Sequence, residues 1–201
     1  MLKVGLTGGL ACGKSFVGEA LASYGCLLIQ ADELGHEVLA AGGEAYEPVI
    51  REFGREIVAA DGQIDRRRLA ARVFGDQAAL ARLNALVHPP VVRREEQLIA
   101  AFRAREPNGI AVVEGAILIE TGGYRRFDRL ILVVCTEEQQ LERALRREGA
   151  AETDVRARLG NQMTLDEKRK FAHFVIDTSH AKEDTLRQTR AVYEELRKIE
   201  I

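Results

Sequence analysis

The sequence predicts an α/β protein with a five-stranded parallel sheet that is covered by helices on both faces. Five short segments are almost continuous runs of apolar residues. Strands with both faces buried have this composition, whereas a strand with one wet face alternates apolar and polar residues. Segments of helical pattern separate the runs, and strands that alternate with helices form parallel sheets. The expected strands lie at 2–7, 26–29, 110–113, 130–134 and 174–176.

The first strand and the helix after it open the chain. The strand at 2–7 ends at two glycines, and a helix is expected over 13–24 because apolar residues recur there at helical spacing. Gly25 then ends this helix. The second strand, 26–29, is followed after two residues by Asp32, with a helix expected over 33–40.

The long middle segment, 33–109, is mostly helical in its pattern. After the third and fourth strands, a charged helical segment is expected over 137–172, and a helix over 182–199 ends the chain. Glycine and proline mark the expected breaks in the helical segments. These breaks are Gly42-Gly43, Asp61-Gly62, His88-Pro89-Pro90, Gly149 and Gly160.

Bulk composition limits the classes of function. The chain has 201 residues, a hydrophobic share of 46%, a charged share of 30% and a net charge of −2. These values describe one domain with a core of its own, without the basic excess that favours nucleic acid and without an apolar run that would span a membrane. We expect a small-molecule substrate, no nucleic-acid or membrane partner, and a monomer or small homo-oligomer.

The cysteines indicate the compartment. Cys12, Cys26 and Cys135 are odd in number and widely spaced, and no Cys-x-x-Cys or Cys/His cluster suggests zinc. A reducing compartment suits such cysteines. The first residues lack the apolar core and cleavage site of a signal peptide. We therefore expect a cytoplasmic protein.

A phosphate-binding loop is the clearest motif. Residues 8–15, G-G-L-A-C-G-K-S, fit G-x-x-x-x-G-K-[ST] between an expected strand and an expected helix. Glycines let the backbone N–H groups close around phosphates, and the helix adds its positive end. Lys14 can reach the β- and γ-phosphates, and the Ser15 hydroxyl can hold Mg²⁺. A glycine-rich turn that binds nothing is the alternative, although chance would produce the motif in roughly one of several hundred such sequences. Cys12 is interpreted as a residue that only fills the loop.

Polar residues stand at the carboxyl ends of other strands. In open parallel sheets the ligand lies outside these ends. Asp32 could accept or orient the proton of an attacking hydroxyl, although Asp also suits the N-cap of the helix at 33–40. Glu114 could hold Mg²⁺ through water or could be an ordinary charge at a strand end. Thr178 follows the last strand.

Basic residues and one histidine have two interpretations each. Arg143, Arg146 and Arg147 lie within about one helical turn, as in a lid that closes over ATP, although a charged helix is often only solvated surface. Arg66 opens the triple 66–68, most of which is expected on the surface. His88 precedes two prolines, and a lone histidine is more often structural than catalytic.

The chain resembles the dephospho-coenzyme A kinase family over nearly its whole length. Residues 61–69, D-G-Q-I-D-R-R-R-L, and 83–89, L-N-A-L-V-H-P, are similar to that family's D-G-x-I-D-R-x-x-L and L-N-x-I-x-H-P segments. This combination is more specific than the phosphate loop, which many folds share. Further similarities lie in the loop at 6–15, in Ala31-Asp32, in Asn161-Gln162-Met163 with Lys168, and in Val175-Ile176-Asp177.

The resemblance implies a P-loop NTPase fold with three αβα layers and a single kinase domain in three parts. These parts are a nucleotide core (about 1–31, 110–136 and 173–201), a helical coenzyme A subdomain (about 32–109) and a lid (about 137–172). It implies ATP as donor, Mg²⁺ held by Ser15, and dephospho-coenzyme A as acceptor. The resemblance also implies that Asp32 is the catalytic base and that Lys14 and Arg143 stabilise the transferred group. It implies that the nucleotide is bound by Gly9, Ala11, Cys12, Gly13, Lys14, Ser15, Phe16, Arg143 and Thr178. The implied contacts with the acceptor substrate are Asp32, Arg66, His88, Glu114 and Leu118.

Some residues depart from the family pattern. Phe16 replaces a Thr after the loop Ser, Gln30 replaces an acidic or polar residue, and Thr178-Ser179 stands where an Asn often helps to hold adenine. Residues 114–118, E-G-A-I-L, replace D-x-P-L-L. These changes affect the expected metal, acceptor and adenine contacts, whereas Lys14, Ser15 and Asp32 are retained.

Other functions remain open at this point. Another small-molecule kinase, for a nucleoside or nucleoside monophosphate, would share the loop but would not need the segments at 61–69 and 83–89. A GTP-dependent switch would explain Asp32-Glu33-Leu34-Gly35 as D-x-x-G, but no N-K-x-D motif follows. A scaffold that binds without catalysis would not need Lys14, Ser15 and Asp32 together. The sequence favours in-line transfer from ATP to dephospho-coenzyme A.

Overall fold

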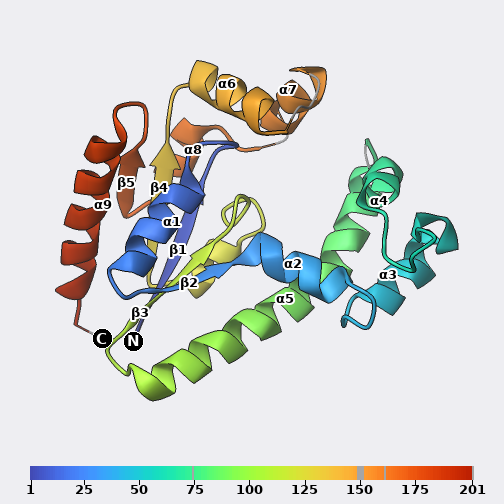
Figure 1. Cartoon of the computed structure of the whole chain (residues 1–201), viewed down its shortest axis with the longest axis horizontal. Helices are drawn as coiled ribbons and strands as arrows, with labels where there is room; N and C mark the ends of the chain where they lie inside the picture. Colours follow the sequence, from blue (N-terminus) through green and yellow to red (C-terminus); the bar gives the residue numbers. More distant parts are fainter. Residues whose placement is uncertain (74, 149–151, 161, 201) are drawn as a thin grey trace. The chain divides into compact units, whose positions relative to one another are not determined.

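One parallel sheet organises the fold. The computed structural model describes residues 1–73, 75–148, 152–160 and 162–200 (Figure 1). The sheet has the strand order β2-β3-β1-β4-β5. Its central strand β1 pairs in parallel with β3 and β4, so that Val4 lies between Val112 and Arg129. The expected five-stranded parallel sheet is confirmed. The strands are β1 (Leu2–Gly8), β2 (Leu27–Gln30), β3 (Ile110–Glu114), β4 (Arg129–Val134) and β5 (Phe174–Asp177).

The chain divides into two compact units, Met1–Ile29 with Ala101–Ile201, and Gln30–Ala100. The first contains the sheet with α1 (Lys14–Ser23), η2 (Gly123–Arg126), α6 (Glu137–Glu148), α7 (Glu152–Gly160), α8 (Leu165–Arg169) and α9 (Lys182–Arg197). The second contains α2 (Ala31–Leu39), α3 (Tyr46–Phe53), η1 (Arg55–Ile57) and α4 (Arg66–Val73), and α5 (Gln77–Arg105) runs from it into the first. The division into nucleotide core, helical subdomain and lid stays a prediction.

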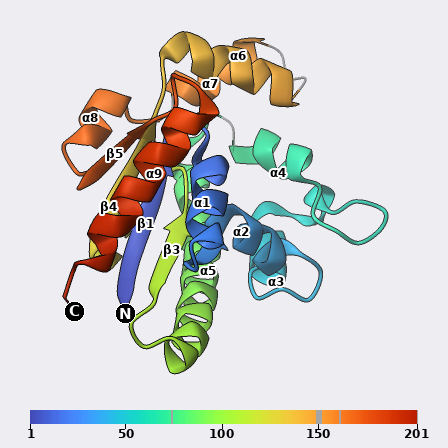
Figure 2. The same ribbon diagram turned by 60° about the vertical axis from the view of Figure 1, so that its left-hand side comes forward.

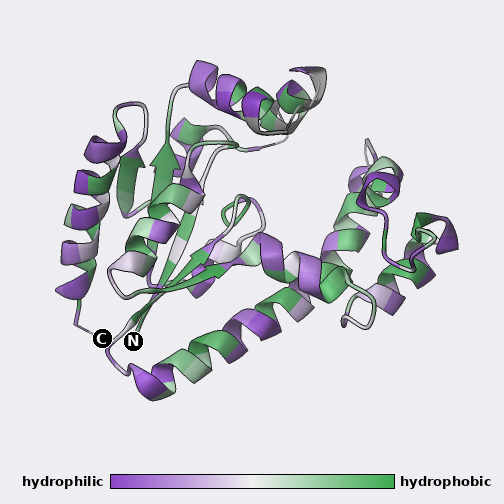
Figure 3. Cartoon of the chain, viewed as in Figure 1, coloured by the Kyte–Doolittle hydropathy of each residue, from purple (hydrophilic) through white to green (hydrophobic). Residues whose placement is uncertain are grey.

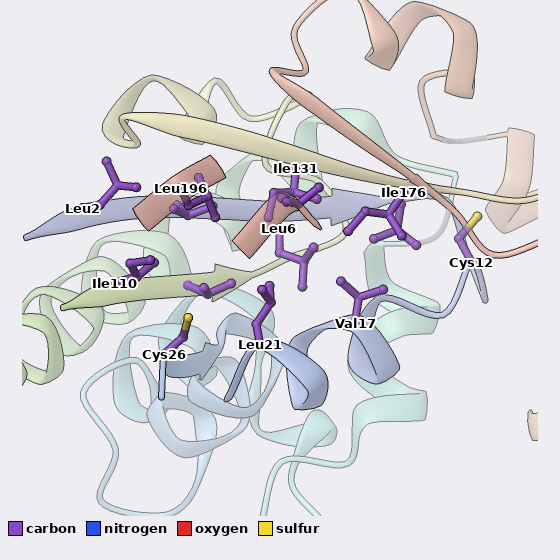
Figure 4. Packing of buried hydrophobic residues seen from close by; sticks show 14 of the residues in the cluster. Leu2, Leu6, Cys12, Val17, Leu21, Cys26, Ile110, Ile131, Ile176 and Leu196 are labelled. Carbon is purple, nitrogen blue, oxygen red and sulfur yellow. The ribbon is translucent and has the colours of Figure 1, made fainter. Parts of the chain in front are cut away.

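The two faces of the sheet bury different sets of side chains. Because strand residues alternate between faces, Leu2, Val4 and Leu6 point to the side that α1 and α9 cover. Figure 2 shows α9 in front of β1 and β4 and α1 beside β3, and Figure 4 shows Leu6 and Ile176 gathered with Val17 and Leu21 of α1. On the other side Leu130 packs against Leu118 and Ile119. Figure 3 shows hydrophobic strands beside helices with hydrophilic outer sides.

The second unit has its own small core and turns. Val49, Ile57 and Leu69 are buried there. Val58 and Ile64 form an antiparallel bridge around the turn at Gly62, where φ is 82°. The Asp65 carboxylate accepts hydrogen bonds from two backbone N–H groups in the first turn of α4 and caps that helix. The expected break at Asp61-Gly62 is therefore confirmed, with a turn that only glycine adopts easily.

The expected break at His88-Pro89-Pro90 is wrong, because α5 continues through both prolines. A proline inside a helix removes one hydrogen bond and crowds the preceding turn, which normally costs about 3 kcal/mol. Pro90 and Val91 are both buried in this helix. Burial therefore favours the helical path that the local sequence disfavours. The expected break at Gly42 is confirmed, because this residue follows α2 with a φ of 84°. The expected break at Gly160 is confirmed as well, because α7 ends there. Gly149 lies outside the described residues.

Among the residues that the structure describes, none of the helices has both the length and the apolar composition of a bilayer-spanning segment.

Candidate active site

The phosphate loop joins the end of β1 to the start of α1. Gly13 has a φ of 83°, and Ala11, with a φ of 55°, also takes the left-handed conformation. A Cβ atom on Gly8 would lie 2.4 Å from the carbonyl oxygen of Val133, and one on Gly9 would lie 2.3 Å from Oε1 of Gln140. The Val133 carbonyl is backbone and cannot move aside, so Gly8 must be glycine, whereas at Gly9 the flexible end of Gln140 could give way. Alternating conformations of this kind turn successive N–H groups toward one concave site, where an anion binds.

Lys14 and Ser15 begin α1 beside the loop. The Lys14 ammonium donates a hydrogen bond of 2.9 Å to the carbonyl of Gly9, and thus reaches back over the loop. The Ser15 hydroxyl donates at 2.9 Å to Oε1 of Glu114, the last residue of β3. Glu114 is 8% exposed. With its proton directed to the carboxylate, the Ser15 oxygen keeps its lone pairs for a cation.

Arg143 and Thr178 brace the loop from α6 and from the end of β5. The guanidinium of Arg143 donates to the hydroxyl and to the carbonyl oxygen of Thr178, at 3.0 and 2.8 Å. The Thr178 hydroxyl has the Cys12 carbonyl at 2.9 Å and the Val134 carbonyl at 3.2 Å. The structure therefore brings Arg143, Thr178 and Cys12 together, all of which the sequence predicts at the nucleotide.

Cys12 is more than a residue that fills the loop. Its thiol is completely buried, with Sγ 3.3 Å from Sγ of Cys135. The hydrogen bond from the Cys135 thiol, aided by the Lys14 ammonium, lowers the pKa of Cys12 to about 7 despite its burial. The same contact raises the pKa of Cys135. The loop conformation turns this side chain into the core.

The residues expected at the acceptor are divided between the two units. Asp32 is an exposed residue of the first turn of α2, which begins at Ala31, with Gln30 as its N-cap residue. The alternative of Asp32 as an N-cap is therefore wrong. Within the second unit Arg66 contacts Nε2 of His36 at 2.6 Å, and His88 lies inside α5. Leu118, in the first unit, is 6% exposed and packs in the core.

Sequence reasoning assigned no role to several residues that lie near the loop. Gln140 is buried beside Gly9, Gln162 accepts a hydrogen bond of 3.1 Å from the Leu10 N–H, and the Lys168 ammonium contacts the Gly8 carbonyl. The family resemblance pointed to Gln162 and Lys168 without a role, and nothing in the sequence pattern singled out Gln140. The side chains of Arg147, expected in the lid, and of Asn161, part of the family segment 161–163, lie outside the described residues. The Lys182 ammonium lies over the aromatic ring of Phe16, 5.7 Å from the centroid of that ring.

The donor set beside the loop suits Mg²⁺. Within the described ranges, no group of three or more His, Cys, Asp and Glu side chains forms a metal cluster. Mg²⁺ in phosphate-transfer enzymes takes few protein ligands, because substrate phosphates and water complete its shell. The Ser15 hydroxyl, oriented by Glu114, is an oxygen donor of this kind. The residues present therefore fit the ion.

Comparison with known sequences agrees with the site geometry. A family model described as dephospho-CoA kinase matches residues 2–184. A relative named dephospho-CoA kinase from Thermobifida fusca is 39% identical over 198 residues, which cover 98% of both chains. One of the same name from Aquifex aeolicus is 36% identical over 196 residues, again 98% of both.

Comparison with solved structures extends the match to the fold. The crystal structure of TT1252 from Thermus thermophilus aligns with a TM-score of 0.81 at 33% identity, covering 97% of both chains. A dephospho-CoA kinase from Campylobacter jejuni aligns with a TM-score of 0.61 at 25% identity over 96% of both. A shikimate kinase from Bacteroides thetaiotaomicron, with a TM-score of 0.55 at 13% identity over 97% of this chain and 98% of that one, shares the fold alone.

Proposed function

Because the chain belongs to the dephospho-CoA kinase family, we propose that it transfers the γ-phosphoryl group of ATP to the ribose 3′-hydroxyl of dephospho-coenzyme A. The products are coenzyme A and ADP, and the reaction is the last step of coenzyme A biosynthesis. The three cysteines are free thiols, which supports a reducing, cytoplasmic location. A monomer or small homo-oligomer with no nucleic-acid or membrane partner remains our expectation.

One observation in the structure carries the proposed function. Between β1 and α1, the loop at 8–15 has the left-handed Ala11 and Gly13, the glycines that allow close approach, and Lys14 and Ser15 at its end. Loops of this geometry bind the phosphates of nucleoside triphosphates. The family match covers this loop and the whole of residues 30–100, where the acceptor is expected to bind.

The groups around the loop stabilise the donor phosphates. The loop N–H groups and the start of α1 would bind the β-phosphate, and Lys14 would move from the Gly9 carbonyl to the β- and γ-phosphates. Arg143 uses two of its five N–H donors on Thr178, and we assign the others to the γ-phosphate. Positive charge placed where negative charge develops lowers the barrier to phosphoryl transfer.

The metal site follows from Ser15 and Glu114. The Ser15 oxygen would hold Mg²⁺, and Glu114, whose carboxylate accepts the Ser15 proton, keeps that oxygen oriented. Mg²⁺ neutralises phosphate charge when it is bound with ATP. We expect Glu114 to act through the Ser15 hydroxyl or through water.

On the acceptor side, Asp32 is the proposed base. Its carboxylate would accept the proton of the ribose 3′-hydroxyl while that oxygen attacks the γ-phosphorus. One P–O bond forms to the 3′-oxygen, the bond to the β-phosphate oxygen breaks, and ADP leaves with its electron pair. Arg66, His88 and Leu118 are proposed acceptor contacts on the basis of the family segments, and Thr178 and Phe16 are proposed nucleotide contacts.

The acceptor decides between this function and its alternative. The purified chain should consume ATP in a coupled assay with dephospho-coenzyme A, and should be at least tenfold less active with AMP, CMP or adenosine. A product phosphorylated at the 3′-position, identified by mass spectrometry and nuclear magnetic resonance, would establish the site of transfer. Turnover only on a nucleoside or nucleoside monophosphate would replace the proposal with the other small-molecule kinase.

A further inference from the structure

Lys168 on α8 is the largest completely buried side chain among the described residues, and it carries a charge. Removing an ammonium from water costs several kcal/mol unless each of its donors finds an acceptor. Lys168 has three acceptors: the carbonyl oxygens of Ala116 at 3.0 Å and Gly8 at 3.4 Å, and the Glu120 carboxylate at 2.9 Å. The three donors of the ammonium are thus all used.

The acceptors of Lys168 come from segments far apart in the sequence. Gly8 is the first residue of the phosphate loop, whereas Ala116 and Glu120 follow β3. The Thr7 hydroxyl also donates to the Ala116 carbonyl, at 3.3 Å. The ammonium therefore joins the start of the phosphate loop to the segment after β3.

A second contact ties the same part of the chain to the loop. Gln162, which lies between α7 and α8, accepts the hydrogen bond from Leu10 N–H, and the Glu120 carboxylate accepts one of 3.2 Å from Met163 N–H. Two of the first three loop residues, Gly8 and Leu10, are thus held by the stretch 162–168 that follows α6 and α7.

We propose that Lys168 is a positioning residue for phosphoryl transfer, which with Gln162 holds the phosphate loop in its ATP-binding conformation. Lys168 is completely buried and therefore does not serve as a solvated surface charge. The carbonyl of Gly8 is fixed by the ammonium, and so the peptide that begins the loop keeps one orientation. This inference rests on the proposed use of ATP but not on the identity of the acceptor.

The main test replaces Lys168 by methionine, which has a similar length and no charge. Lys168→Met should raise the Kd for ATP and lower kcat/KM for ATP by about tenfold or more, the effect of losing a hydrogen bond to a charged group. The KM for dephospho-coenzyme A should change by less than about twofold, because Lys168 is not among the residues proposed to contact that substrate. Lys170→Met, on an exposed lysine at the end of the same helix, is the matched control and should behave like the original chain.

A second variant separates positioning from folding. Lys168→Met leaves Glu120 without its cation, which can destabilise the fold. Lys168→Met/Glu120→Gln removes this charge as well, and is expected to regain stability in urea unfolding while its ATP binding stays weak. Gln162→Ala, which leaves the ion pair intact, should weaken ATP binding by several-fold.

The outcomes are distinct. A folded Lys168→Met or double variant with the original Kd and KM for ATP would overturn the proposal and leave Lys168 with a role in stability alone. If the original chain binds ATP but does not phosphorylate dephospho-coenzyme A, the proposed function fails. The Kd for ATP, measured by equilibrium dialysis, still tests the positioning role in that case.

Discussion

The hydrogen bond from Ser15 to Glu114 shows how one contact prepares a reactive group. A serine hydroxyl can direct its proton in several ways, and only some of them leave its oxygen open to a cation. Glu114 accepts this proton at 2.9 Å and removes the ambiguity. The family pattern has an Asp at this strand end, and the longer Glu side chain still reaches Ser15.

The first prediction concerns the proposed base. Asp32→Asn keeps the size of the side chain but removes its ability to accept a proton. We expect kcat to fall by roughly 10²–10⁴-fold, the usual contribution of general base catalysis, with the KM for ATP nearly unchanged. Steady-state kinetics with both substrates would measure it. Glu33→Gln, on the neighbouring exposed carboxylate, is the control, and near-original turnover of Asp32→Asn would remove Asp32 from the mechanism.

The second prediction concerns pH and the paired thiols. Cys12 should ionise near pH 7, because the Cys135 thiol donates a hydrogen bond to it, whereas burial raises the pKa of Cys26 to about 12. A lowered pKa favours the folded state when the thiol is ionised. This contribution to stability is complete above the usual value of 9.0 and is lost as the pH falls through about 7.

Ultraviolet titration of thiolate absorbance tests this second prediction. Cys135→Ala removes the donor and should move the midpoint of Cys12 upward toward 9.0. Cys26→Ala is the control, and it should leave the midpoint near pH 7 in place. If Cys135→Ala leaves the midpoint unmoved, the thiol pair is not the cause of the shift.

At the scale of the element, α8 is very short for a helix and depends on its cap. The Thr164 hydroxyl accepts the Glu167 N–H at 3.3 Å, and the Glu167 carboxylate accepts the Thr164 N–H at 3.0 Å. This reciprocal capping box satisfies two donors at the start of a five-residue helix. The helix carries Lys168, and so its cap helps to place the buried ammonium.

The third prediction tests this cap. Thr164→Ala should lower the free energy of unfolding by about 1 kcal/mol, because the N-terminal donors of α8 lose their acceptor. Urea unfolding followed by circular dichroism would measure the change. Glu167→Gln retains an acceptor for the Thr164 N–H and should cost less than half as much. Equal losses in the two variants would contradict this prediction and would mean that the charge of Glu167 contributes as much as the Thr164 hydroxyl.

Helix α5 shows a limit of local patterns. Two adjacent prolines lie inside it and predict a break. Gly42 and Gly62, in contrast, adopt left-handed conformations at the breaks expected for them. Glycine permits a turn through its own backbone freedom, so that the local sequence predicts it well. A proline only penalises the helix, and burial of its neighbours can offset that penalty.

At the scale of the whole molecule, the residues proposed to bind the nucleotide lie within the unit formed by Met1–Ile29 and Ala101–Ile201. The loop, Glu114, Arg143, Thr178 and Lys168 all belong to this unit. Asp32, Arg66 and His88 belong to Gln30–Ala100.

The fourth prediction links ATP to the stability of the fold. A ligand that binds only the folded state stabilises it by about 2.7 kcal/mol at 100 times its Kd. Mg²⁺-ATP should therefore raise the unfolding temperature of the chain, measured by calorimetry. Lys14→Met should abolish most of this rise, because Lys14 is the proposed phosphate ligand, whereas Lys198→Met, on an exposed ion pair of α9, should keep it. A full rise with Lys14→Met would place ATP elsewhere.

The sequence by itself determined the sheet, the phosphate loop and the family. Continuous apolar runs predict buried strands, and the loop motif is contiguous, so that each is specified by neighbouring residues. Lys14, Ser15 and Thr178 were predicted beside one another because parallel strands end at the same edge of the sheet.

Only the tertiary structure decided the contacts that support this loop. Two partners of Lys168, Ala116 and Gly8, lie 52 and 160 residues away. Ser15 is 99 residues from Glu114, and Cys12 is 123 residues from Cys135. The order β2-β3-β1-β4-β5, which does not follow the chain, brings these residues together. A local pattern carries no record of that order, because it depends on how whole strands and helices pack their apolar faces.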